Sequence, residues 1–190
     1  LIEQQKIINQ AKKVRASFWR SASLKEGSSK LEKNSAYKQL VDDGEIGTPR
    51  MVWTKEFRGP FQPKSGEWIQ DKRKSGGCLV DKNAHHFDLM NWWCGGKVRK
   101  MAAFGGNAVN RVIKGEHQVH DHATVSFEYD NGVRGTLQLC LFARAFPEEE
   151  LEMGIIGDKG TLETRISAIE VLQWKLGTGQ KEPIVHKVEA

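Results

Sequence analysis

The chain has 190 residues, of which 38% are hydrophobic, and its mean hydropathy is −0.55. No apolar run approaches the roughly 20 residues of a membrane-spanning helix, and the opening LIEQQKIINQ is too polar for a signal peptide. The cysteines Cys78, Cys94 and Cys140 are few, odd in number and widely spaced, which is typical of reduced thiols. We therefore expect a cytoplasmic protein rather than a membrane protein or a secreted disulfide scaffold.

The formal net charge of +5 is concentrated at the N-terminal end of the chain. Residues 1–33 hold eight Lys and Arg against three Asp and Glu, whereas residues 34–190 hold 21 of each sign. A nucleic-acid-binding protein needs its basic residues on one face of the folded body. We interpret the uneven charge as a solvated helix and loop near a domain boundary, and we expect no nucleic-acid partner.

The first predicted elements are a short helix over residues 4–13 and a strand over residues 14–20. Residues 21–34 are polar and rich in Ser, Lys and Gly, so we predict a loop there. A second helix follows that loop. It carries Tyr37 and nearby apolar residues on one face, and Gly44 is placed to end it.

A strand is predicted over residues 50–57, followed by a long irregular segment over residues 58–77 that contains two Pro and four Gly. Long loops inside compact domains are usually functional. Residues 78–94 form the longest helical candidate, and Gly95 and Gly96 stop it.

After this helix the hydrophobic period changes from helical to strand-like. Apolar residues alternate with polar ones from Ala123 to Tyr129, and Asp130-Asn131-Gly132 is a hairpin turn signal. The returning strand ends near Leu141, and further strands are predicted over residues 150–156, 161–164, 168–176 and 183–188. This order predicts an α+β fold, a large open and predominantly antiparallel (mixed) sheet with helices packed on one face.

The helix over residues 78–94 holds the best candidates for chemistry. Asp81, His85 and Asp88 are spaced i, i+4, i+7 and so share one face. A carboxylate one turn from an imidazole can orient it and raise its basicity, which makes His85 a candidate general base. A structural alternative stays open, in which Asp81 caps the helix and His85 packs against Trp92 or Trp93.

The segment SGGCLVDKNAHHFDLMNWWCGG resembles a signature of the glucose-fructose oxidoreductase, inositol dehydrogenase and rhizopine-catabolism family, SGGG-x-x-x-D-x-G-x-H-x-x-D. The resemblance covers most of residues 14–165 and keeps the family's order. Its other pieces are VRASFWR, YKQLVDDGEIGTPRMVW, WIQDKRKSGG, DHATVSFEYDNGVRGTL and ELEMGIIGDKGTLE.

The resemblance implies a fold and an activity. Family members pair an N-terminal Rossmann domain with a C-terminal domain on a large open sheet, and they move hydride between NAD or NADP and a sugar, polyol or related compound. By resemblance, His85 takes the hydroxyl proton and Asp81 holds and tunes it. It also places Arg20 near the substrate. From their own positions, we further expect Trp68, Lys82 and Asp88 to bind substrate and the backbone at Gly76 and Gly77 to contact the cofactor.

Some of these roles have alternatives. Asn83 stands where the family usually has Gly, and Lys82 and His86 flank the motif. Lys82 either contacts substrate or reaches solvent. Trp68 either stacks on the C–H face of a sugar or serves as part of a lid or core. Arg20 either lies near the substrate or is a surface charge at the end of a strand.

Two family features are absent from the sequence. It has no Glu-Lys-Pro, and no G-x-G-x-x-G between a strand and a helix. We therefore expect residues 1–13 to be the last helix of a Rossmann domain that this chain lacks, and residues 14–190 to be a C-terminal substrate-binding and oligomerisation domain. We expect the chain to form a homo-oligomer, a dimer or tetramer through the sheet face, and to be inactive alone.

Three other functions are compatible with parts of the sequence. IIGDKGTLETRI contains the I-I-G-x-x-G of a KH domain, so the Gly157-Asp158-Lys159-Gly160 loop is a candidate nucleic-acid site, although alternation before it favours a hairpin turn. His117, His120, Asp121 and His122 are dense in metal ligands but lack the spacing of a zinc site, so we expect no metal. The third alternative is a domain that serves only for assembly.

Overall fold

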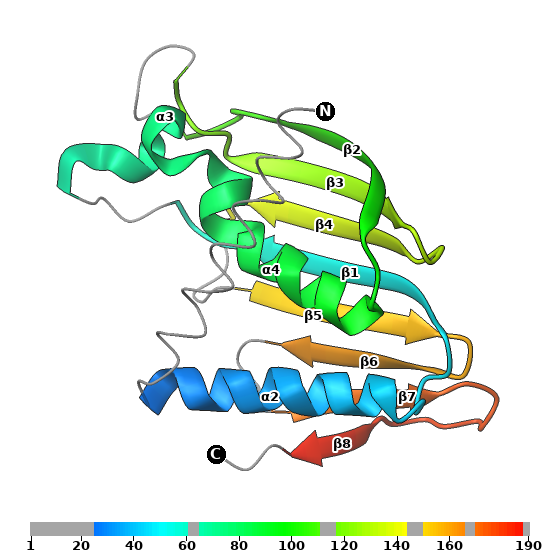
Figure 1. Ribbon diagram of the computed structural model, residues 1–190. Coiled ribbons are helices and arrows are strands. Elements are labelled where there is room, and N and C mark those ends of the chain that lie inside the picture. The colour runs from blue at the N-terminus through cyan, green and yellow to red at the C-terminus, as the bar shows by residue number, and fades with distance from the viewer. Residues whose placement is uncertain (1–24, 61–64, 111–116, 144–149, 166–169, 188–190) are drawn as a thin grey trace.

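The computed structural model describes residues 25–60, 65–110, 117–143, 150–165 and 170–187. Two long helices lie over one face of a single eight-stranded sheet (Figure 1). They are α2 (Lys25–Asp42) and α4 (Cys78–Cys94). The predicted helix over 4–13, the strand over 14–20, the domain boundary between them and Arg20 lie outside the described residues.

The sheet has the strand order β2-β3-β4-β1-β5-β6-β7-β8. Neighbouring strands are antiparallel except for β1 and β4, which are parallel. The predicted α+β class, with a mixed open sheet and helices on one face, is therefore confirmed. The strands are β1 (Pro49–Phe57), β2 (Val98–Gly106), β3 (His122–Tyr129), β4 (Arg134–Cys140), β5 (Glu150–Gly157), β6 (Gly160–Arg165), β7 (Glu170–Lys175) and β8 (Ile184–Lys187).

Alternation in the sequence explains why the central strands bury one face. In β3 the odd-numbered residues from Ala123 to Tyr129 are all buried, while Thr124 and Ser126 face solvent. In β4 the register pairs Leu137 with Val125, so the apolar residues of both strands line the side that the helices cover. The core lies between this face of the sheet and the two helices.

Glycines lie at both ends of α4, and the predicted stop at Gly95 is confirmed. Gly77 precedes its first turn and Gly95 ends it in the left-handed conformation, with φ 64° and its N–H donating to the Asn91 carbonyl. Beyond the helix, Asn131 of the β3–β4 turn donates to the Cys94 carbonyl at 2.9 Å. The turn between these strands therefore also caps the helix that lies over the sheet.

A stacked aromatic pair joins the two helices. The rings of Tyr37 on α2 and Trp93 on α4 stack with their centroids 4.1 Å apart. The Tyr37 hydroxyl donates to the Leu162 carbonyl of β6 at 2.6 Å, and burial raises the pKa of Tyr37 well above its ordinary value. The predicted apolar face of this helix is confirmed, because Tyr37 and Val41 are buried and Leu40 packs against the core.

Two predictions in this part of the chain were wrong or incomplete. Residues 25–34, predicted as loop, belong to α2. Lys, Glu and Leu favour a helix. Ser and one Gly lower the helix propensity, Gly by about 1 kcal/mol, but the packing of Tyr37 in the later turns stabilises the helix by more than this. The segment over 58–77 was predicted to be irregular, but it contains the 3-10 helix η1 (Ser65–Gln70) and the short helix α3 (Lys72–Ser75).

Strand β2 was not predicted at all. It is one edge of the sheet, and most of its residues are exposed or half-buried, so apolar and polar residues do not alternate along it. Lys100 and the 80% exposed Phe104 illustrate this pattern. Backbone pairing with β3 therefore makes this segment a strand, although its own sequence pattern does not predict one.

A buried carboxylate anchors the segment that follows β2. Asp121 is 2% exposed and accepts backbone N–H hydrogen bonds from Ala108, Val109 and Asn110 at 2.7–3.1 Å. Burial raises the pKa of Asp121, but these hydrogen bonds and the His122 ring nitrogen at 2.9 Å together lower it to about 2. Asp121 is therefore ionised at neutral pH and ties this segment to the start of β3.

We predict that Asp121→Asn lowers the free energy of unfolding at pH 7 by about 2 kcal/mol, because a charged acceptor of several N–H groups becomes neutral. The folded-state pKa lies below its ordinary value of 3.8, so the stabilisation is complete above pH 4 and is lost as the pH falls through 2. Urea unfolding between pH 7 and pH 3 measures the shrinking difference. Asp43→Asn, in the exposed turn after α2, is the control, and an equal loss in both variants would contradict the prediction.

Candidate active site on helix α4

Helix α4 lies over the middle of the sheet and packs against β1 (Figure 1). Asp81 lies in its first turn and His85 one turn later, and both are half-buried. The positive end of the helix dipole stabilises a carboxylate at the position of Asp81. Asp88, also half-buried, lies a further turn along. The structure thus brings these three side chains to one rigid helix, at the boundary between core and solvent.

The structure does not support the alternative in which Asp81 caps α4. The residue at the cap is Gly77, and no side chain makes a capping hydrogen bond there. The His85 ring lies against the His86 ring, with centroids 3.9 Å apart and planes tilted by 52°. Trp93, suggested as a packing partner of His85, stacks on Tyr37 instead.

The two glycines before α4 form the corner between α3 and α4. Gly76 has φ 81° and ends α3, and Gly77 has φ 96°. A Cβ on Gly76 would lie 3.0 Å from the Val80 side chain, whereas a Cβ on Gly77 would meet nothing within 4 Å. The left-handed backbone and the close Val80 side chain therefore explain why residue 76 is a glycine. At Gly77 the space beside the backbone is open to an approaching group.

Behind this surface lies a buried polar cluster, which we define as Glu56, Asn83 and His86. Glu56 is on β1 and is 4% exposed, and the two α4 residues are 0% and 2% exposed. The Asn83 amide nitrogen donates to Glu56 Oε2 at 2.7 Å and lies 3.0 Å from His86 Nδ1. Glu56 Oε2 and His86 Nδ1 are 3.7 Å apart. The cluster joins helix to sheet directly beneath the candidate residues.

The charges of the cluster are unevenly distributed. Burial, assisted by neighbouring His85, lowers the pKa of His86 well below 6.5, so its ring is neutral at pH 7. The Arg58 guanidinium lies 3.6 Å from Glu56 Oε1 and offsets part of its negative charge. Burial, together with the carboxylates of Asp121 and Glu56, raises the pKa of the Cys78 thiol to about 11. The start of α4 thus lies in the field of Glu56.

From the sequence, Asn83 stood out only as a departure from the family's usual Gly and His86 only as a residue flanking the motif, and Glu56 was not singled out. A signal was available on β1, where Val52, Thr54 and Glu56 alternate with exposed or half-buried residues. A carboxylate at the third inward position of such a strand has to find a buried partner. The partner is 27 residues away, on a different element.

The remaining predicted residues are dispersed around the helix. Lys82 is half-buried on α4, beside Asp81. Trp68 lies on η1, before α3, and is 38% exposed. Gln70 and Gln118 hydrogen-bond at 3.0 Å and join that segment to the residues before β3. Arg20 lies outside the described residues.

The histidine-rich segment before β3 does not form a cluster. Within the described ranges, no three or more His, Cys, Asp or Glu side chains gather where a metal ion would fit. His122 contacts Asp121, whose main role is to hold backbone N–H groups. In that same part of the chain, none of the helices has the length and apolar character of a membrane span.

The Gly157-Asp158-Lys159-Gly160 loop is a hairpin turn between β5 and β6, as the alternation indicated, whereas a KH loop joins two helices. A Cβ on Gly157 would lie 2.1 Å from the Ile46 carbonyl oxygen, and one on Gly160 would lie 2.3 Å from that of Trp174. The Lys159 N–H donates to the Ile46 carbonyl. These glycines are therefore required by close backbone packing.

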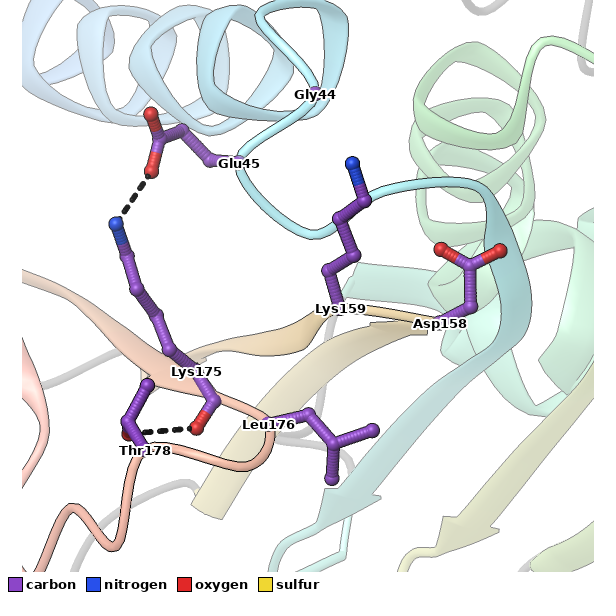
Figure 2. A pocket seen from close by; sticks show the side chains of 7 residues that line it. All are labelled: Gly44, Glu45, Asp158, Lys159, Lys175, Leu176 and Thr178. Atoms are coloured by element: carbon purple, nitrogen blue, oxygen red, sulfur yellow. Dashed lines mark hydrogen bonds and ion pairs between the residues drawn. The ribbon is translucent and has the colours of Figure 1, made fainter.

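An open hollow of about 440 Å³ lies beside this turn (Figure 2). Glu45 and Lys175 form an ion pair of 3.1 Å at its rim, and Lys159 extends along it. On the other side, Asp158 accepts from the Thr48 backbone N–H at 2.9 Å. Charges of both signs compensate one another here, so the hollow has no net preference for an anion.

Comparison with known proteins identifies the family. Residues 35–163, well over half of the chain, match the GFO/IDH/MocA C-terminal domain. The chain belongs to the GFO/IDH/MocA family. The resemblance inferred from the motifs is therefore confirmed.

Solved structures and curated sequences agree with this assignment to the GFO/IDH/MocA family. An inositol dehydrogenase homolog from Azotobacter vinelandii, complexed with NAD+, is 19% identical with a TM-score of 0.70 over 82% of this chain and 41% of its own. The WlbA dehydrogenase of Bordetella pertussis, with NADH and UDP-GlcNAcA, is 20% identical with a TM-score of 0.62 over 77% and 44%. At these identities the likeness shows the fold alone.

The uncharacterized oxidoreductase YrbE of Bacillus subtilis is 28% identical over 124 residues, which are 65% of this chain and 34% of that protein. The chain thus spans less than half the length of each of these relatives.

We predict that Gly157→Ala destabilises this GFO/IDH/MocA domain by at least about 2 kcal/mol, because the new methyl group would overlap the Ile46 carbonyl. Thermal unfolding measures the loss. Gly59→Ala, where a Cβ would meet nothing within 4 Å, is the control and should change stability by less than about 1 kcal/mol. Equal melting temperatures for the two variants would show that the turn tolerates a side chain.

Proposed function

We propose that this chain is the substrate-side domain of an NAD(P)-dependent oxidoreductase that moves hydride between the cofactor and a sugar, polyol or related hydroxy compound. One observation carries the proposal. In a GFO/IDH/MocA domain, a half-buried carboxylate and imidazole, Asp81 and His85, lie one turn apart on a helix fixed to the sheet. The relatives complexed with NAD+ and NADH support a nicotinamide cofactor.

The proposed roles follow from the chemistry of alcohol oxidation. When hydride leaves the carbinol carbon, the hydroxyl proton has to be taken up, and a neutral imidazole at neutral pH is suited to accept it. His85 takes this proton, and Asp81 stabilises the resulting imidazolium from one turn away. The nicotinamide, when bound, accepts the hydride.

This chain contacts the cofactor rather than holding it. The space beside Gly77 is open, and no side chain caps the start of α4, so the backbone there is accessible to a planar ring. Gly76 shapes the same corner. Within the described residues no strand leads through a glycine-rich loop into a helix that would bind a dinucleotide phosphate.

Substrate binding is assigned to the side chains around this pair. Lys82 and Asp88 flank His85 on α4 and offer a donor and an acceptor to hydroxyl groups. Trp68 on η1 is exposed enough to stack on the C–H face of a sugar ring. Arg20 is proposed from the family resemblance alone. The free thiols of the three cysteines support the proposed cytoplasmic location.

The chain spans less than half the length of its relatives, which leaves room for a cofactor domain to complete the proposed site. We propose that it works beside a Rossmann domain, to which residues 1–13 would belong, and that it is inactive alone. Measurable NAD-dependent turnover by the 190-residue chain would contradict the proposal that it needs a separate cofactor domain.

The test uses the gene product that carries this chain together with its cofactor domain. NAD and NADP reduction is measured with a panel of polyols and sugars. We predict that His85→Gln and Asp81→Asn lower kcat/KM by about 10²–10⁴-fold, the range for loss of a general base and its partner. His120→Gln, at an exposed histidine, is the control and should keep wild-type activity. Wild-type activity in His85→Gln would exclude the assignment.

The open face of the sheet is the proposed oligomer interface. It lies opposite the helices (Figure 1), and it carries Met51, which is 50% exposed, beside its half-buried partner Ile156 on β5. Lys55 and Glu152 pair at 3.2 Å on the same face. A face that combines an exposed apolar side chain with paired charges suits a second copy of itself, related by a twofold axis.

We predict that Met51→Glu weakens self-association at least tenfold, because it replaces an exposed apolar side chain of the proposed interface with a charge. Light scattering coupled to gel filtration measures the oligomer over a range of concentrations. Leu176→Glu, at a 73% exposed residue in the turn after β7, is the control and should leave the oligomer intact. A wild-type chain that is monomeric at every concentration would rule out this interface.

A further inference from the structure

The buried cluster beneath α4 goes beyond the roles proposed so far. Glu56, Asn83 and His86 are each at least 96% buried, and none of them reaches the surface where a substrate would bind. A buried carboxylate is costly, so the fold has to compensate it with partners. Glu56 finds them in the Asn83 amide and the Arg58 guanidinium. What this cluster does to His85 follows from its geometry.

The Asn83 amide orients both of its neighbours. Glu56 Oε2 and His86 Nδ1 both approach the amide nitrogen, at 2.7 and 3.0 Å. Since a carboxylate only accepts hydrogen bonds, the nitrogen, with its two N–H groups, has to face it. The second N–H then points to His86 Nδ1, which must be the unprotonated nitrogen of the neutral ring. His86 therefore carries its proton on Nε2.

The cluster reaches His85 through the neighbouring ring. The His85 and His86 centroids are 3.9 Å apart, so the orientation of one ring limits that of the other. His86, held neutral by burial and by His85, adds no positive charge beside it. The Glu56 carboxylate behind His86 thus favours a proton on His85. Because burial keeps the His86 ring neutral, His86 does not take up that proton itself.

We infer that Glu56 is a positioning residue of this site, which, through Asn83 and His86, fixes the His85 ring and raises its affinity for a proton. The consequence for turnover rests on the proposed function, in which His85 accepts the hydroxyl proton. The other charged groups on α4 and on the elements packed against it are unchanged in every variant tested below, so they do not contribute to differences between variants. They are Asp81, Lys82 and Asp88 on α4, Arg58 after β1, Lys72, Arg73 and Lys74 on α3, and Asp121 near Cys78.

The first experiment measures the pKa of His85 in the 190-residue chain by NMR of the histidine ring protons, with the six histidines assigned by substitution. Glu56→Gln keeps the shape and can still accept from Asn83, but it removes the charge. We expect the pKa of His85 to fall by about 0.5–1 unit. Glu56→Asp keeps the charge and should restore most of the wild-type value.

The matched control is Glu152→Gln, which removes the charge of a half-buried glutamate on the opposite face of the sheet, where Glu152 pairs with Lys55. It should move the pKa of His85 by less than about 0.2 units. An unchanged pKa in Glu56→Gln, or equal shifts in both variants, would overturn the inference. These results do not depend on turnover, so they separate this inference from the proposed function.

A second measurement uses the wild-type chain, so it can be made even if Glu56→Gln does not fold. Nitrogen-15 spectra of the wild-type chain report which ring nitrogen of His86 carries the proton. We expect an unprotonated Nδ1 and a protonated Nε2 throughout the range from pH 5 to pH 8. A proton on Nδ1, or titration of His86 near its ordinary value of 6.5, would contradict the assigned geometry.

Discussion

The hydrogen bond between Glu56 and Asn83 is the constraint on which the candidate site depends. It joins β1, near the centre of the sheet, to the first half of α4 inside a region that water does not reach. Breaking it would leave a buried carboxylate without one of its partners, which costs several kcal/mol. Helix α4 is therefore fixed in rotation about its axis, and Asp81 and His85 face outward because Asn83 and His86 face inward.

The rest of the fold supports this arrangement. The stacked pair of Tyr37 and Trp93 holds the C-terminal half of α4, and Asn131 caps its end from the β3–β4 turn. Among the described residues, two long helices cover one face of a wide sheet, and the other face is the one proposed for a second copy (Figure 1). One sheet would thus carry the proposed active site on its helical side and the proposed oligomer interface on its open side.

Local patterns predicted most of the fold, whereas contacts between distant elements were out of reach. The end of α4 followed from Gly95, and the central strands followed from alternation. Strand β2 was missed because an edge strand has no buried face to encode. The Asp81 and His85 pair was visible at i, i+4, but its support by Glu56 was not, because that contact depends on how α4 packs on β1.

The most direct test of the central claim follows the transferred hydrogen. The gene product that carries this chain with its cofactor domain is given a substrate deuterated at the carbinol carbon, and the reduced nicotinamide is examined for deuterium. If Asp81 and His85 serve hydride transfer, the label moves to the nicotinamide ring in the wild type, and its transfer slows in step with kcat/KM in His85→Gln. Turnover without label on the nicotinamide, or equal label transfer without His85, would contradict the account.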